Sequence, residues 1–452
     1  MDKKLTLSSY VLIGSMLFGL FFGAGNLIFP VHMGQEAGSN VMVATIGFLI
    51  TGIGLPFLGV VAIGASKSDG LFGLSSRIHP LYAYGMTVLL YLTIGPFFAL
   101  PRTGTVSYEI GLAPYIAKEY QTLGLAGFTI LFFLIALIFS LNPSKILTWV
   151  GKILNPLFLL FLAFLIVISF LSPMGNVSGA EIHGAYIAEP FFKGFTEGYN
   201  TMDALASLAF GIIVVQTLRD LGVQSPRAIA IGTVKAGFVS VLLMGVIYSC
   251  LAYIGATSVA KYAVSANGGV ALAQIAHYYF GSAGSILLAI IVTLACLKTA
   301  IGLITACSET FQSLFPESLS YKGYVYVFTL VSCLIGNVGL TQIISLSIPV
   351  LMFLYPLAIT LIILAFLSPI FGHRQIVYIL TTVCTLFASL ADAFNAMPDP
   401  IKSQSFVQEF LALAHNLLPF FDLGMGWVIP MVIGLSLGWL IGITQKDSVR
   451  SM

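Results

Sequence analysis

Two glycine-rich, polar interruptions of apolar stretches are the parts of this sequence best suited to hold ions or charged groups. The first covers residues 19–26 (GLFFGAGN) and the second covers residues 194–203 (GFTEGYNTMD). Glycine permits unusual backbone dihedrals and close approach, which favours a break in a helix. A break frees backbone N–H groups that favour an anion at the start of one half-helix, and carbonyl groups that favour a cation at the end of the other.

Four ionisable residues add chemistry to these apolar surroundings: Arg102, Glu109, Asp203 and Lys298. A charge within a membrane helix costs at least about 2.5–3.5 kcal/mol on insertion scales, so such groups face the interior, pair or line water-filled paths. An ion pair between Arg102 and a carboxylate would form either a movable gate or a static tie between helices, and we favour the tie. The sequence leaves open whether Asp203 is its partner or carries a proton.

The residues of enzyme active sites and metal sites are not clustered in this sequence. Its six histidines are scattered near the ends of apolar stretches without HExxH spacing, and its five cysteines lack CxxC spacing. We therefore expect no catalytic activity, no metal site and no cofactor. An ion channel would need a pore of repeated carbonyls or charged rings, which one pair of interruptions does not match.

The composition of the chain indicates the class of protein in which these residues are held. Of the 452 residues, 58% are hydrophobic and 8% are charged, whereas soluble domains carry about 25% charged residues. Runs of about 20 apolar residues recur, and each is long enough to cross a hydrocarbon core. The sequence predicts one all-α integral membrane domain over 1–452, held in a lipid bilayer. A net charge of +2 gives no sign of a nucleic-acid partner, and no obligate protein partner is evident.

The apolar windows predict twelve transmembrane helices, with the interruptions in spans 1 and 6. The windows lie near residues 10–33, 40–65, 80–110, 123–141, 149–172, 193–218, 227–256, 282–311, 322–339, 341–367, 374–394 and 424–444. The breaks are five spans apart, which predicts two repeats, over about 8–172 and 190–368, followed by additional helices over about 370–446. Because five is odd, the repeats are inverted relative to each other.

Close packing around small residues is the alternative explanation of the two interruptions. It accounts for the first interruption better than for the second, because the second also holds Glu197, Asn200, Thr201 and Asp203. Non-helical backbone at membrane depth is tolerated only where it is buried in protein or lines a cavity. The paired interruptions therefore predict a binding site between the repeats.

The distribution of basic residues predicts the orientation in the membrane. With the N-terminus inside, 13 of the 19 basic residues fall on cytoplasmic segments and helix ends, as the positive-inside rule expects. We therefore expect both termini in the cytoplasm. The first apolar run continues to Pro30 without a small-residue cleavage site, so we expect it to remain as the first span.

Four stretches, in chain order, resemble one family: 23–30 (GAGNLIFP), 100–104 (LPRTG), 198–206 (GYNTMDALA) and 294–303 (LACLKTAIGL). The chain resembles the bacterial branched-chain amino acid:cation symporters, from span 1 through span 10 and into the tail. The resemblance implies a LeuT-like fold and import of leucine, isoleucine and valine across the bacterial plasma membrane by alternating access, driven by Na+ or H+. Another small amino acid, a nucleobase or an amine as substrate, or exchange, is the alternative.

A zwitterionic amino acid needs donors for its carboxylate, acceptors for its ammonium group and an apolar wall. We assign the donors to backbone N–H groups at the first break, and the acceptors to carbonyls at the second break, beside a threonine hydroxyl. The aromatic candidates for the wall are explained equally well by ordinary helix packing. The substrate-binding candidates are Phe22, Gly23, Ala24, Gly25, Asn26, Tyr199, Asn200, Thr201 and Met202.

The resemblance also implies an ion site, and the chain departs from its pattern there. LeuT-type proteins hold a sodium ion between span 1 carbonyls and two adjacent hydroxyl residues of span 8, in a pattern similar to Ala-x-x-Thr-Ser. The matching stretch begins at Ala295 and keeps Thr299, while Gly19 and Phe22 can supply carbonyls. Lys298 stands where the other hydroxyl belongs.

Two hypotheses follow for Lys298. Its ammonium group takes the place of the bound sodium and exchanges a proton during the cycle, or it snorkels or pairs with a carboxylate while Na+ binds nearby. The first hypothesis predicts proton coupling, and the second predicts sodium coupling.

Overall fold

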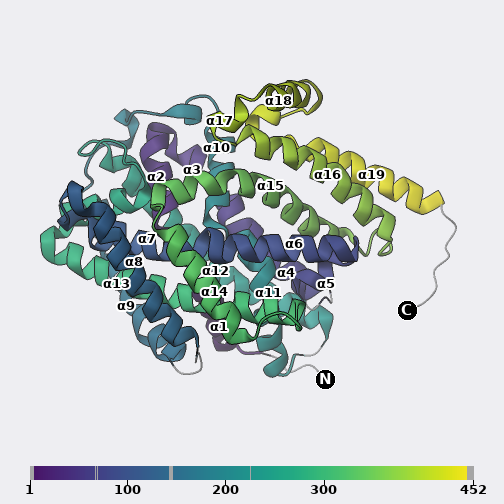
Figure 1. Cartoon of the computed structure of the whole chain (residues 1–452), viewed down its shortest axis with the longest axis horizontal. Helices are drawn as coiled ribbons and strands as arrows, with labels where there is room; N and C mark the ends of the chain where they lie inside the picture. The colour runs from purple at the N-terminus through teal and green to yellow at the C-terminus, as the bar shows by residue number, and fades with distance from the viewer. Residues whose placement is uncertain (1–4, 67, 69, 142–145, 224, 445–452) are drawn as a thin grey trace.

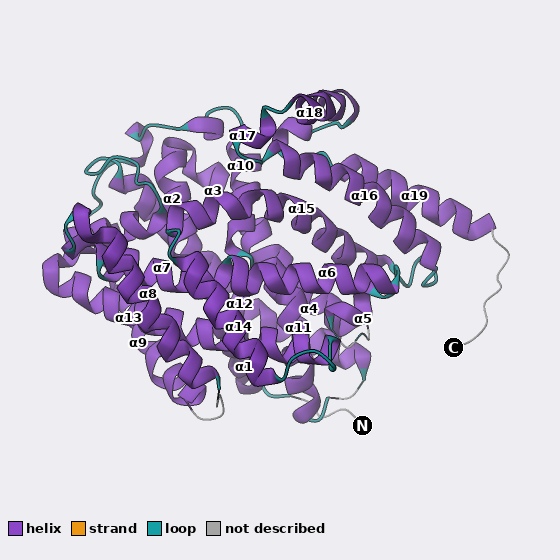
Figure 2. Ribbon diagram, in the orientation of Figure 1, coloured by secondary structure: helices purple, strands orange, loops and turns teal. Residues whose placement is uncertain are grey.

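The structure is a computed structural model that describes residues 5–66, 68, 70–141, 146–223 and 225–444. Within these ranges the chain folds into helices joined by short loops and holds no strand, as Figure 2 shows. The predicted all-α class is confirmed. Residues 1–4 and 445–452, which carry the predicted cytoplasmic termini and the end of the last predicted segment, lie outside the described residues.

The first predicted repeat contains two interrupted spans in addition to the broken first one. The helix α1 is followed by α2, α3 continues through the π-helical turn η2 into α4, and α6 continues through the π-helical turn η3 into α7. The bounds are α1 (Leu7–Phe21), α2 (Ala24–Ala37), α3 (Val41–Leu49), η2 (Ile50–Gly54), α4 (Leu55–Ser66), α5 (Leu71–Ser75), α6 (Pro80–Leu92), η3 (Thr93–Phe97), α7 (Ala99–Gly111), α8 (Gln121–Ser140) and α9 (Ile146–Leu171).

The second predicted repeat begins with the other broken span. The helices over 375–444 come after this repeat. The bounds are α10 (Pro190–Glu197), the 3-10 turn η8 (Gly198–Thr201), α11 (Asp203–Asp220), α12 (Pro226–Ser258), α13 (Gly268–Leu314), α14 (Tyr321–Gly336), α15 (Leu340–Leu367), α16 (Gln375–Asn395), α17 (Asp399–Lys402), α18 (Ser405–Leu417) and α19 (Val428–Thr444). In Figure 1, α16 and α19 lie side by side at one edge of the molecule.

The contacts between helices in one repeat are matched by equivalent contacts in the other repeat. Both halves of the first broken span, α1 and α2, pack against α12, while both halves of the second broken span, α10 and α11, pack against the interrupted span α3–α4. Exchanging span 1 with span 6 and span 7 with span 2, a shift of five in each case, converts one arrangement into the other. The helices α7 and α13, which are also five spans apart, pack against each other. The two broken spans therefore occupy equivalent positions between the repeats.

The helices have the length and the exposed apolar surface expected of a membrane protein. Seven helices of the described chain are long and apolar enough to cross a membrane, or eight if the bent pair α10 and α11 counts as one span, and four shorter apolar helices accompany them. Large apolar side chains such as Leu131, Phe238 and Leu330 are exposed on the outer helices, where lipid would cover them. The count of twelve spans and the repeat boundaries remain predictions.

Two helical segments were not predicted from hydropathy. The first turns of α13 begin at Gly268, well before the predicted span, and the helix kinks at Gly281, whose φ is +59°. The predicted loop 395–423 contains α18, which covers the outer end of α16 through contacts such as Phe410 on Phe394. Both segments are short or only partly apolar, so a window tuned to membrane-spanning helices does not detect them.

Close packing of α2 against α12 generates a prediction about stability. A Cβ atom added at Gly255 would lie 2.0 Å from the carbonyl oxygen of Val31, so Gly255→Ala must push the helices apart and should cost about 1–3 kcal/mol. Thermal unfolding of the purified protein in detergent measures the effect. The control is Gly245→Ala on the same helix, where the nearest atom is 4.0 Å away. Equal midpoints for the two variants would contradict the close packing.

Candidate functional site

The first break is formed by two extended residues and is stabilised by a local side chain. The helix α1 ends at Phe21, Phe22 and Gly23 are extended, and α2 begins at Ala24. The side-chain oxygen of Asn26 accepts a hydrogen bond from the Gly23 N–H at 2.8 Å. This bond satisfies one of the backbone donors that a helix start leaves without a partner. The predicted break in span 1 is confirmed, and Asn26 is the residue that caps it.

The second break contains a residue in an unfavourable conformation. The helix α10 passes into η8, and Met202 then adopts the left-handed conformation with φ +61° before α11 begins. The two halves of the span are bent by 46°. A left-handed conformation costs a non-glycine residue about 1–2 kcal/mol, so tertiary contacts must hold this turn in place. The predicted break in span 6 is confirmed.

A buried side-chain cluster joins the two breaks. The Asn26 amide nitrogen donates to a carboxylate oxygen of Asp203 at 2.5 Å and also to the Tyr248 hydroxyl. The Tyr248 hydroxyl donates to the same Asp203 oxygen at 3.2 Å. Asp203 opens α11, where the helix dipole favours a negative group. One amide therefore caps the first break with its oxygen and holds the start of the second half-helix of span 6 with its nitrogen.

Arg102 ties the second break to two other helices. Its guanidinium donates to the carbonyl oxygen of Asn200 at 2.7 Å and to the Ser347 hydroxyl on α15, and it lies 5.2 Å from the ring centre of Phe29 on α2. The guanidinium is buried and hydrogen-bonds to neutral groups, whereas Asp203 bonds to Asn26 and Tyr248. Neither residue is therefore the other's hydrogen-bond partner, and whether Asp203 carries a proton stays a prediction to test.

Some backbone groups assigned to the substrate are engaged inside the protein. The Gly23 N–H bonds to Asn26, which leaves the N–H groups of Ala24, Gly25 and Asn26 in the first turn of α2 as the candidate donors. At the second break, the Tyr199 carbonyl accepts from the Met202 N–H, and the Asn200 carbonyl accepts from Arg102. These carbonyls keep only a second lone pair for an ammonium group.

The remaining substrate candidates lie at the two breaks, in contact with neighbouring helices. The Thr201 hydroxyl donates to the Gly198 carbonyl at 3.0 Å. Tyr199 stacks on Tyr355 of α15 with 4.0 Å between ring centres, and Phe22 lies 6.3 Å from the ring of Tyr248. Packing therefore accounts for part of the role of both aromatic residues. Gly25 is close to the second break, because a Cβ there would lie 3.9 Å from the Asn200 carbonyl oxygen.

All five residues assigned to the coupling-ion site line one small cavity at the first break. The cavity has a volume of about 20 Å³, close to that of one bound water or one small ion. The Thr299 hydroxyl at its wall donates to the Ala295 carbonyl at 3.1 Å, and the half-buried Lys298 lines the same space. The predicted members that the structure brings together are Gly19, Phe22, Ala295, Lys298 and Thr299.

Two larger cavities continue from this one along α13. A cavity of about 340 Å³ shares Gly19, Lys298 and Thr299 with the small cavity and extends to Glu309. A further cavity of about 560 Å³ shares Glu309 and reaches residues 70–73 at the start of α5. In Figure 1, α5 lies at the end of the molecule opposite α17 and α18. The ion-site residues are therefore linked by shared cavity walls to this end.

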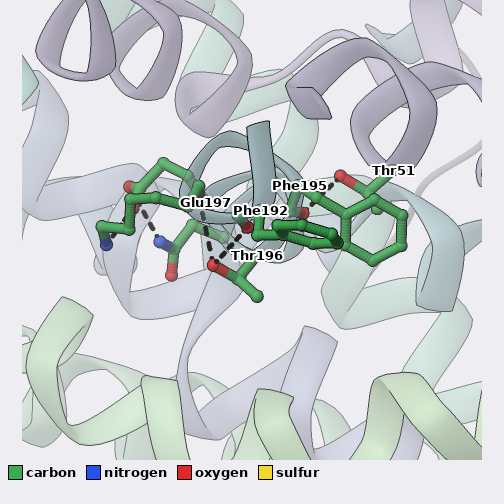
Figure 3. A network of polar contacts seen from close by, with 7 residues as sticks. Thr51, Phe192, Phe195, Thr196 and Glu197 are labelled. Carbon is green, nitrogen blue, oxygen red and sulfur yellow. Dashed lines mark hydrogen bonds and ion pairs between the residues drawn. The ribbon is translucent and has the colours of Figure 1, made fainter. Parts of the chain in front are cut away.

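The opposite end holds a separate cavity of about 220 Å³ that stops at Tyr199 and Asn200. Glu197 borders it and is held by Lys193 at 3.1 Å and by the Asn200 amide at 2.9 Å. Figure 3 shows this network, in which Thr51 also donates to the Phe195 carbonyl at 2.7 Å. Side-chain contacts therefore hold the second break on the side of this cavity as well.

Glu109 lies apart from the other intramembrane charges. It borders a different cavity, of about 460 Å³, together with His277 and Ser285. It follows Arg102 on α7 by seven residues, a rise of about 10 Å. The predicted group of Arg102, Glu109 and Asp203 is therefore not brought together.

Sequence reasoning missed four partners of the site: Phe29, Tyr248, Ser347 and Tyr355. Phe29 lies in the stretch 23–30 beside the first break, whereas Tyr248, Ser347 and Tyr355 lie on α12 and α15 in stretches without an interruption or a charge. A tyrosine or serine within a membrane helix is common, so no local signal marked them. Only the tertiary fold places them against the breaks.

Paired broken helices that face each other between two repeats define a membrane transporter of the LeuT-like fold. The fold is similar to that of two solved structures of Mhp1: the inward-facing conformation matches with TM-score 0.60 at 16% identity over 96% of this chain and 90% of that one. A closed conformation of Mhp1, described as a nucleobase-cation-symport-1 family transporter with bromovinylhydantoin bound, matches with the same TM-score at 15% identity over 98% and 94%.

Sequence comparison identifies the family. The family model described as branched-chain amino acid transport protein matches residues 6–445. The branched-chain amino acid permease BrnQ of Lactobacillus delbrueckii subsp. lactis is 46% identical over 99% of both chains. BrnQ of Bacillus subtilis is 44% identical over 99% of this chain and 100% of its own length. The chain belongs to the branched-chain amino acid transport protein family.

Because Asn26 bonds to both breaks, a substitution of Asn26 should disturb both breaks together. Asn26→Leu keeps the volume but leaves the Gly23 N–H and the Asp203 carboxylate without this partner, at about 1–3 kcal/mol for each buried group. We expect a lower unfolding midpoint and loss of leucine binding to the purified protein. The control Asn337→Leu removes an exposed amide at the end of α14 and should leave both properties unchanged. Unimpaired leucine binding by Asn26→Leu would show that the cluster is dispensable.

Proposed function

We propose that this protein imports branched-chain amino acids by cation-coupled symport, with a single site between the two breaks exposed alternately to the two sides of the membrane. The observation that carries the proposal is the cluster of Asn26, Asp203 and Tyr248, because it couples two half-helices that belong to different repeats. Membership of the branched-chain amino acid transport family supports the substrate class. Alternating access moves one bundle of helices against the rest around a fixed site, and this cluster would keep the two breaks together as that site.

The substrate would lie between the first turn of α2 and the second break. Its carboxylate would accept from N–H groups of Ala24, Gly25 and Asn26, where the helix start favours an anion. Its ammonium group would bind carbonyl oxygens of η8 beside Thr201. Arg102 would tie η8 to α15 as a static tie, rather than act as a gate paired with a carboxylate, because its two hydrogen bonds go to neutral groups on these elements.

The coupling ion would act at the cavity between the first break and α13. Its volume of about 20 Å³ suits a single small occupant. Either Na+ binds there to the Thr299 hydroxyl and span 1 carbonyls, or the Lys298 ammonium group takes its place and exchanges a proton. The two cavities that continue past Glu309 would release ion and substrate to the cytoplasm, with both termini on that side. No other cofactor is required.

Labelled leucine uptake into liposomes that contain the purified protein tests the substrate and the ion together. One arm imposes a sodium gradient and the other imposes a proton gradient, each with an ionophore control that dissipates it. We expect accumulation in at least one arm, competed by isoleucine and valine. No specific leucine uptake, or uptake that alanine, uracil or choline competes while isoleucine and valine do not, would overturn the substrate class. Equilibration without accumulation would overturn symport in favour of exchange.

Lys298→Thr separates the two roles of the lysine. If the ammonium group replaces sodium, the new hydroxyl beside Thr299 completes a pair of oxygen ligands, and the variant should gain sodium stimulation and lose proton drive. Uptake by each variant under each gradient is the measurement. Lys322→Thr removes an exposed charge at the start of α14 and serves as the control. A variant whose ion dependence matches the unmodified protein would exclude the replacement hypothesis.

A further inference from the structure

Asp392 is a buried carboxylate that the proposed transport cycle does not use. It lies near the outer end of α16, in the helices that follow the repeats, and it is 1% exposed. Its oxygens have no side-chain hydrogen-bond partner in the described part of the chain, and the backbone N–H of Gly426 is the donor that lies near them. The ion pairs found among the described residues do not include it.

The groups around Asp392 belong to both the additional helices and the second break. A Cβ added at Gly426, just before α19, would lie 3.1 Å from one carboxylate oxygen. The next residue, Trp427, adjoins the Tyr199 hydroxyl of η8, which is also within electrostatic reach of Asp392. The Trp427 N–H and the Tyr199 hydroxyl are buried near each other and have no other partner among the described residues. Buried polar groups of η8 and of the segment before α19 therefore lie near this carboxylate.

The elements packed against α16 carry no charge that would balance the carboxylate. These elements are α15, α18 and α19. On α15 the facing titratable group is Tyr355, and the described residues of α19 include no charged side chain. On and beside α18, Glu409 and His415 are exposed, and His415 pairs with Asp422 at 3.0 Å. Among the described residues, Asp392 thus has no counter-ion on the elements packed against α16.

An ionised carboxylate in such a position is strongly disfavoured unless a proton or a cation neutralises it. The available partners favour a proton. Sodium needs several oxygen ligands, whereas the indole of Trp427 presents only an N–H donor. A neutral acid can both donate its O–H and accept from the indole or a tyrosine hydroxyl, which would satisfy the atoms now without partners.

We propose that Asp392 is a proton-binding site and that, as a neutral acid, it holds α16 and α19 against the second break. Asn395, one turn further along α16, lines the outer cavity together with Tyr199, so water in that cavity is the source and acceptor of the proton. When the break moves away from α16, water reaches the carboxylate and ionises it. Low pH on the outer side therefore favours the packed arrangement, and high pH favours separation.

The fluorescence of Trp427 provides a test that does not depend on transport. The chain has three tryptophans, so Trp149→Phe with Trp439→Phe leaves Trp427 as the single emitter. We expect its emission to titrate with pH, and we expect Asp392→Asn in the same background to abolish the titration. The control His415→Gln removes the nearby histidine and should leave the titration in place.

Three results would overturn the proposal: a titration that persists in Asp392→Asn, a titration lost in His415→Gln, or emission that responds to added sodium at fixed pH and not to pH. If the tryptophan variants do not fold, infrared difference spectra of the protein with its native tryptophans replace the test. A protonated-carboxyl band that appears at low pH and is lost in Asp392→Asn supports the site, and an unchanged band contradicts it.

Discussion

One side-chain amide connects the two halves of this protein. Asn26 uses its oxygen to cap the first break and its nitrogen to hold Asp203 at the second, with Tyr248 of α12 bonded to both. Each of these groups is buried, so water cannot replace a lost partner. The two breaks therefore behave as one polar unit in an apolar protein, and the position of one half-helix fixes that of the other.

The remaining contacts at the breaks depend on this unit. Met202 stays in its left-handed conformation because the turn is held on both sides, by Arg102 on the Asn200 carbonyl and by Asn26 on Asp203. The small cavity at the first break exists because Gly23 has no side chain, and a Cβ there would lie 3.5 Å from Thr299. Substrate site, ion site and tie are thus built from the same few interruptions of regular helix, which is how a binding site forms at membrane depth.

Much of this arrangement could be predicted from the sequence, because breaks are local. Glycine and polar residues in 19–26 and 194–203 indicated both breaks, and the five-span offset between them indicated the repeat. The family resemblance implied the ion-site residues, and in the structure these residues line one cavity. Partners at long range could not be predicted, because a neutral tyrosine such as Tyr248 carries no local signal. Asp392 was missed for another reason: its helix lies outside the repeat in which the pattern was sought.

A structure of the purified protein with leucine bound would test the central claim most directly. The account predicts density for the amino acid between the first turn of α2 and η8, with its carboxylate at the N–H groups of Ala24 to Asn26 and with the bonds from Asn26 to Asp203 intact. Leucine bound elsewhere, or bound there with Asn26 and Asp203 separated, would contradict the claim that one buried amide links both breaks into a single transport site.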